Sequence, residues 1–87
     1  MKEKDLMKVS IAFETIPELE NRKIQFDMLL IEKVLRAHVG ENKAVIISEK
    51  SIILDELLSK IPKQFKPKIT SKENITYSEL LKNTYNI

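Results

Sequence analysis

The first pattern along the chain is a strict alternation of apolar and other side chains near the N-terminus. In the stretch MKVSIAFET, Val9, Ile11 and Phe13 occupy every second position, with polar or small residues between them. A period of two built from β-branched and aromatic residues is typical of a strand with one buried face. The pattern predicts a strand over residues 6–14.

The apolar period then lengthens to that of a helix. Apolar residues recur every three or four positions over residues 16–38, which predicts one long helix there. Thr15 and Glu18 have the spacing of a capping box at its start. Gly40, the only glycine, stands where a left-handed residue would end the helix.

Two shorter apolar runs follow the glycine. The run KAVIIS (43–48) is rich in β-branched residues and predicts a strand, although a helix continuing to Ile61 fits it as well. The run SIILDELLSKI predicts a helix with Ser51 as its cap and Pro62 after its end. One face of that helix would carry Ile53, Leu54, Leu57, Leu58 and Ile61.

The C-terminal third has weaker patterns. Residues 62–74 contain two prolines and no clear period, which predicts a loop with room for a short edge strand near 65–70. The stretch TYSE has capping-box spacing from Thr76 to Glu79 and predicts a last short helix. Its buried face would hold Tyr77, Leu80, Leu81 and Tyr85.

These elements predict a single small α+β domain spanning residues 1–87. Its centre would be a β-α-β core with a long central helix, joined by two shorter C-terminal helices. A helical crossover between neighbouring strands makes them parallel. The alternative is a mostly α-helical chain with one N-terminal strand.

Composition narrows the class of protein. The chain has 87 residues, a net charge of +2, 43% hydrophobic residues and no cysteine, so a disulfide scaffold and thiolate metal sites are excluded. The charged N-terminus has no apolar core of a signal peptide, and no apolar stretch approaches the ~20 residues that span a bilayer. We expect a soluble, cytoplasmic protein with no membrane contact.

The predicted long helix carries more apolar surface than one packed face requires. On a helical wheel its apolar arc is about 220° wide, against the ~100° of an ordinary amphipathic helix. Leu19, Phe26, Leu30 and Ala37 share one part of this arc. The helix is therefore either a central element covered on two sides or a binding element. The binding hypothesis places a protein interface at Phe26, Leu29, Leu30 and Lys33, with a homodimer as the expected form and another protein partner as the alternative.

The residues of catalysis are scarce. There is one histidine, His38, and one glycine, so a nucleophile–base set and a phosphate-binding glycine loop have no evident components. No Asp, Glu and His residues have the spacing of a metal site. We expect no enzymatic activity, no cofactor, no bound metal and no small-molecule substrate.

A lysine-rich segment supports a second hypothesis. Residues 62–87 carry five basic and two acidic side chains. A basic loop with an interleaved aromatic ring can follow phosphates and stack a base. The main prediction remains a non-enzymatic regulatory or protein-interaction module. The alternative is a small nucleic-acid-binding regulator that uses Lys60, Lys63, Phe65, Lys66, Lys68 and Lys72.

Overall fold

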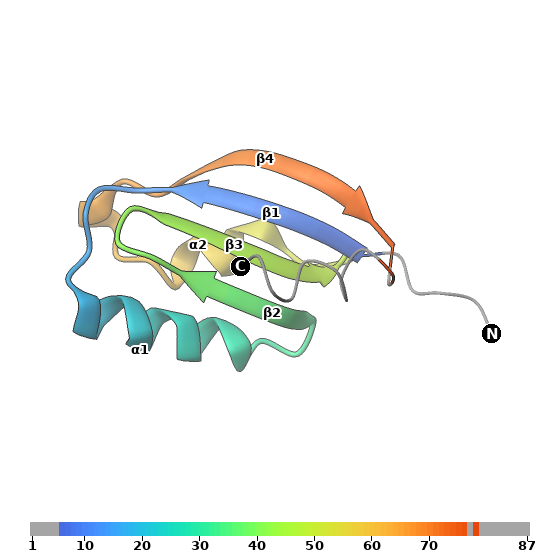
Figure 1. Cartoon of the computed structure of the whole chain (residues 1–87), viewed down its shortest axis with the longest axis horizontal. Coiled ribbons are helices and arrows are strands. Elements are labelled where there is room, and N and C mark those ends of the chain that lie inside the picture. Colours follow the sequence, from blue (N-terminus) through green and yellow to red (C-terminus); the bar gives the residue numbers. More distant parts are fainter. Residues whose placement is uncertain (1–5, 77, 79–87) are drawn as a thin grey trace.

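The structure, a computed structural model, describes residues 6–76 and 78 and shows a two-layer α+β domain (Figure 1). Four strands and two α-helices follow one another, with a short 3-10 turn before the last strand. In chain order they are β1 (Leu6–Ala12), α1 (Glu18–Leu29), β2 (Val34–Val39), β3 (Lys43–Glu49), α2 (Leu54–Ser59), the 3-10 turn η1 (Lys63–Phe65) and β4 (Lys68–Ile75).

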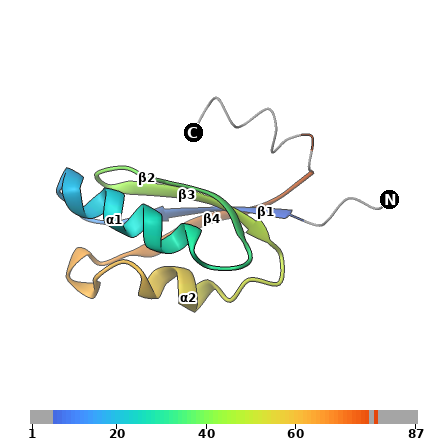
Figure 2. The same ribbon diagram turned by 90° about the horizontal axis from the view of Figure 1, so that it is seen from below.

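The four strands form one sheet in the spatial order β2-β3-β1-β4, and every neighbouring pair is antiparallel. Both helices cover the same face of this sheet (Figure 2). Strand β3 lies between β1 and β2, the two strands that α1 connects. This element order and strand order are those of the split β-α-β, or ferredoxin-like, topology.

The main core lies between the sheet and the helices. Val9 and Ile11 on β1 are fully buried there, and they lie opposite Ile46 and Ala44 of β3. The alternation that predicted the first strand is confirmed by this placement, because every second residue of β1 faces the helices. A second small cluster contains Leu6, Ile47 and Ile75.

The predicted helix over residues 16–38 is too long, since only Glu18–Leu29 are helical and Val34–Val39 form a strand. Helix α1 ends at Leu29, and successive tight turns follow, in which the amide of Leu30 donates to the carbonyl of Asp27 and that of Val34 to Ile31. From Val34 onward the chain pairs with β3. Val34 and Val39 are buried in that sheet, and β-branched residues favour such a half-buried pleated surface.

The predicted caps of that helix are also wrong. The N-cap is Pro17 without a side-chain hydrogen bond, so the Thr15–Glu18 capping box does not form. Gly40 lies in the β2–β3 hairpin instead of at a helix end, and its amide donates to the carbonyl of Lys43 at 2.8 Å. Its φ is not positive, and an added Cβ would lie 3.3 Å from that carbonyl oxygen. Glycine therefore serves a close backbone approach here.

The strand predicted at 43–48 is confirmed as β3, but it is antiparallel to β1. The reason is β2, which the sequence pattern did not predict. This additional strand between α1 and β3 reverses the direction of the chain once more before β3 begins. The parallel β-α-β core and the mostly α-helical alternative are both wrong. The coarser prediction, a small α+β domain, is confirmed.

The C-terminal third differs from its prediction as well. Helix α2 begins after Ile53 and not at Ser51, so Ile53 is exposed instead of packed. Most of the predicted loop at 62–74 is the edge strand β4, which is longer and begins later than the short edge strand expected near 65–70. Of the two predicted C-terminal helices, α2 is present, and the one after Thr76 lies mostly outside the described residues.

Candidate interaction surface

Helix α1 has apolar side chains on two opposite faces. Facing the sheet, Ile24 and Met28 are 5% and 0% exposed. Facing away from it, Leu19, Phe26 and Leu30 are 83%, 62% and 68% exposed. We call these three residues the outer stripe. An ordinary surface helix buries one apolar stripe and shows water a polar face, so the outer stripe needs an explanation of its own.

The outer stripe follows one line along the helix, with Arg22 and Lys23 in the turn between Leu19 and Phe26. At about 100° per residue its three side chains fall within roughly 40° of one another, on the side opposite Met28. From Leu19 to Leu30 the stripe is about 16 Å long at a rise of 1.5 Å per residue. Leu29, 44% exposed, lies at its margin.

Charged residues border the stripe on both sides. On one side, Arg22 donates to the Glu18 carboxylate at 2.8 Å in an exposed ion pair. On the other side lie Glu20, Lys23 and, one turn after Lys23, Asp27. None of the three has an ion-pair partner among the residues that the structure describes. One positive and two negative charges without ion-pair partners thus share one margin of an exposed apolar surface.

A hydrogen bond fixes α1 against the edge of the sheet. The side-chain oxygen of Gln25 accepts a hydrogen bond from the amide of Val39 at 2.9 Å. Because β2 is an edge strand, this amide on its outer side would otherwise have no strand to pair with. The contact holds α1 in place beside β2, with the outer stripe directed away from the sheet.

The structure brings three of the four predicted interface residues to the surface. Phe26, Leu29 and Leu30 are exposed, although the predicted helix was too long. Lys33 lies in the turn after α1, and its ammonium group donates to the carbonyl of Ser51 at 3.3 Å. The stripe residue missing from the predicted interface is Leu19. Its position on the helical wheel, in the same arc as Phe26 and Leu30, was the signal for it.

The residues of the lysine-rich hypothesis are only partly brought together. Lys63 and Lys66 line a shallow apolar groove between α2 and the loop before β4. Lys66 also lies 3.5 Å from the Glu14 carboxylate, in an exposed ion pair. Lys60 is the C-cap residue of α2.

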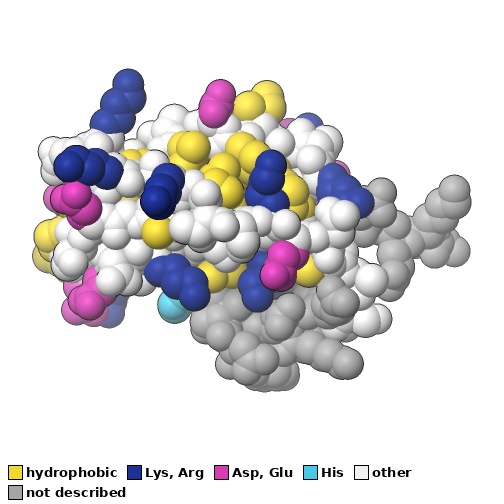
Figure 3. Space-filling view, turned by 90° about the horizontal axis from the view of Figure 1, so that it is seen from above, with side chains coloured by type: hydrophobic (Ala, Val, Ile, Leu, Met, Phe, Trp, Pro, Cys, Tyr) yellow, Lys and Arg dark blue, Asp and Glu magenta, His cyan; other side chains and the backbone are white. Residues whose placement is uncertain are grey.

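The other two lysines of that hypothesis point to opposite faces of the sheet. Lys68 pairs with Ala12 and Lys72 with Val9, and these two positions of β1 are three residues apart. The surface on the β4 side shows basic side chains scattered between apolar ones and not gathered into one patch (Figure 3).

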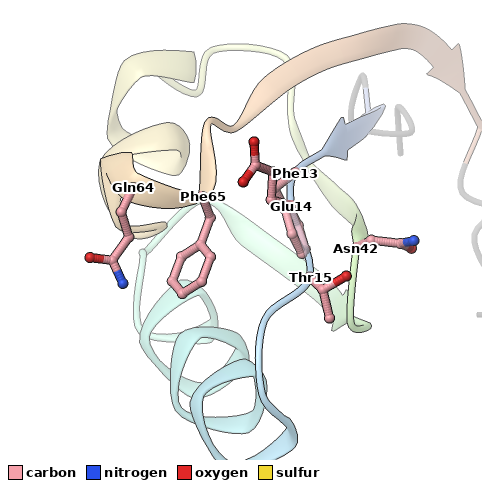
Figure 4. A pocket seen from close by; sticks show the side chains of 6 residues that line it. All are labelled: Phe13, Glu14, Thr15, Asn42, Gln64 and Phe65. Atoms are coloured by element: carbon pink, nitrogen blue, oxygen red, sulfur yellow. The ribbon is translucent and has the colours of Figure 1, made fainter.

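Phe65 lies in a pocket at the end of the domain where η1 meets the end of β1 and the β2–β3 hairpin. Figure 4 shows its ring in this pocket, which is lined by Phe13, Glu14, Thr15, Asn42, Gln64 and Phe65. The ring is half-buried and packs against the main core. Its backbone carbonyl accepts a hydrogen bond from the Glu14 amide at 2.7 Å, so this residue also connects η1 to the segment after β1.

Two other kinds of site are absent from the part of the chain that the structure describes. Within 6–76 and 78, no three His, Asp or Glu side chains come close enough to hold a metal ion. Among the described helices, none has the length and apolar character required to cross a bilayer. No protein-family model, curated protein or solved structure matches the chain. The exposure of Leu19, Phe26 and Leu30 along one line makes the outer stripe a candidate interaction surface.

Proposed function

We propose that this protein is a non-enzymatic protein-interaction module whose binding surface is the outer stripe of α1. The observation that supports this proposal is the exposure of Leu19, Phe26 and Leu30 on the face of α1 opposite its buried one. Single exposed apolar residues are common on soluble proteins. Three in one line on a rigid helix form a patch of the kind that marks interaction sites.

The stripe can supply much of the binding free energy of a modest interface. Covering roughly 300 Å² of apolar surface at about 25 cal/mol per Å² contributes on the order of 7 kcal/mol. Association costs about 4–15 kcal/mol, so an equal apolar area on the partner and contacts from the margins are also needed. Phe26, an aromatic residue near the middle of the stripe, has the character of an energetic centre for such an interface.

The direct test is a charge placed within the stripe. In Leu30→Glu, a carboxylate would have to lose its water on binding, so association with a second copy or another protein should be lost. The side chain is already 68% exposed, so the fold should persist. Leu30→Met is the matched control, because it keeps an apolar side chain of similar volume. A folded Leu30→Glu variant that keeps every interaction of the unaltered chain contradicts the proposal.

A second pair of substitutions separates this surface from the lysine-rich one. Lys63→Gln together with Lys66→Gln should leave association unchanged, since both residues lie by the groove near α2. If instead that variant loses a binding activity toward DNA or RNA that weakens steeply with salt, the lysine-rich segment is the functional surface. Binding titrations at low and moderate salt distinguish the two results.

A further inference from the structure

We infer that the partner of the outer stripe is a second copy of this chain, with the two α1 helices packed antiparallel. This inference rests on the proposed function and adds the identity of the partner. It comes from the order of charges along the margin of the stripe, which is complementary to itself when one helix is reversed.

The apolar residues define the register. An antiparallel pair that aligns the two ends of the stripe places Leu19 opposite Leu30 of the second copy. Phe26 then lies opposite Lys23 of the second copy. The long aliphatic stem of a lysine can cover the ring while its ammonium group stays in water. The full length of the stripe, about 16 Å, is covered in this arrangement.

The charges favour the same arrangement. In a two-fold antiparallel pair, a given margin of one helix faces the same margin of the other. Lys23 and Asp27 share a margin, one turn apart, so Lys23 of each copy meets Asp27 of the other. Both residues lack an ion-pair partner among the described residues of their own chain, and the dimer supplies one twice.

A parallel pair is disfavoured by the same side chains. When two parallel helices are related by a two-fold axis, the Lys23 margin of one helix faces the Arg22 margin of the other, and residues with the same number lie at the same level along the axis. Lys23 of one copy would then lie beside Arg22 of the other, which puts like charges together on both sides of the seam. The two helix dipoles would also point the same way. The antiparallel pair avoids both costs.

The test exchanges charges between copies. In a dimer of the Lys23→Glu variant, the new carboxylate of each copy faces Asp27 of the other copy, which has the same charge. In a dimer of the Asp27→Lys variant, the new ammonium group of each copy faces Lys23 of the other copy. Each variant alone should dimerise roughly tenfold or more weakly than the unaltered chain, because two ion pairs between the copies become two repulsions. In an equimolar mixture, the new carboxylate of one variant meets the new ammonium group of the other, so dimers should reappear. Sedimentation equilibrium of the separate and mixed proteins measures this.

The double variant Lys23→Glu with Asp27→Lys is the matched control. In this variant both ion pairs between the copies form again, with the carboxylate at position 23 and the ammonium group at position 27. It should therefore dimerise like the unaltered chain. A dimer that is unaffected by the single changes, or single variants that the mixture does not rescue, would overturn the antiparallel arrangement. A chain that stays monomeric at all concentrations overturns the second copy as partner. In that case, a Leu30→Glu variant that no longer binds another protein would still support the proposed function.

Discussion

At the scale of single residues, α1 places chemically similar side chains in opposite environments. Met28 is fully buried against the sheet, whereas Leu30, two positions later, is mostly in water. The helical rotation of about 200° between them carries the second side chain to the other face. Residue type alone therefore does not separate the residues that hold the fold together from those available to a partner.

This contrast predicts different stability effects in the two positions. Met28→Ala should lower the free energy of unfolding by about 2–4 kcal/mol, because it removes packed atoms and leaves a cavity. Leu30→Ala should change the stability of the single chain by less than about 0.5 kcal/mol. Urea unfolding at low protein concentration, where association does not contribute, measures both. Equal losses would show that α1 does not lie with Met28 inward.

The hydrogen bond from the Val39 amide to Gln25 gives a second residue-scale prediction. Gln25→Leu leaves this amide without its acceptor and should cost about 1–2 kcal/mol of stability. Gln25→Glu keeps an oxygen in the same place and should cost less. Hydrogen exchange of the Val39 amide reports the contact directly, since exchange should accelerate in Gln25→Leu. An unchanged exchange rate would remove Gln25 from this role.

At the scale of elements, the sequence pattern predicts some strands and fails to predict others. Alternation of Val9, Ile11 and Phe13 is enough to predict β1, because these apolar residues on the face toward the helices alternate with the polar or small residues Lys8, Ser10 and Ala12 on the other face. Strand β4 carries mostly exposed polar residues as an edge strand, so no apolar period marks it. The boundary between α1 and β2 has no glycine or proline, and Val34 fits the helical period. Pairing with β3 decides where the helix ends and the strand begins, and a local sequence pattern holds no information about that pairing.

The outer stripe, as an exposed apolar surface, was predictable in large part from the same helical pattern. The relative directions of Phe26 and Leu30 are the same in a short helix as in a long one, so the error in length did not affect them. Lys33 was misplaced as a helical residue because it follows the unrecognised end of α1. The predicted arc is not a single surface, because Leu30 and Ile31 lie in the turn after α1, and Val34, Leu35 and Ala37 lie in β2.

The competition between helix and strand can be measured. A peptide of residues 16–38 has helical periodicity throughout, so in trifluoroethanol it should form helix beyond Leu30. In the whole chain, the backbone chemical shifts of residues 34–39 should be those of a strand, because β3 supplies the pairing. Helical shifts at 34–39 in the whole chain would contradict the fold. A peptide helix that ends at Leu29 would show that local sequence, and not pairing, sets the boundary.

At the scale of the whole molecule, the sheet has helices on one face, and α1 lies along the β2 side of that layer (Figure 1). The inner face of α1 completes the core, and its outer stripe adds nothing to the fold of the single chain. Two copies packed through α1 would cover both outer stripes with one seam. The same topology serves many unrelated functions, so a function has to be inferred from this surface and not from the topology.

The measurement that tests this account most directly is the molar mass in solution, by light scattering over a range of concentrations, of the unaltered chain and of Phe26→Glu. We expect the unaltered chain to approach twice its 10.1 kDa mass as concentration rises. Folded Phe26→Glu should remain at the mass of one chain, because its carboxylate would be buried in the seam. A dimer that Phe26→Glu leaves intact, or an unaltered chain that stays at the mass of one chain throughout, would contradict the claim that the outer stripe joins two copies.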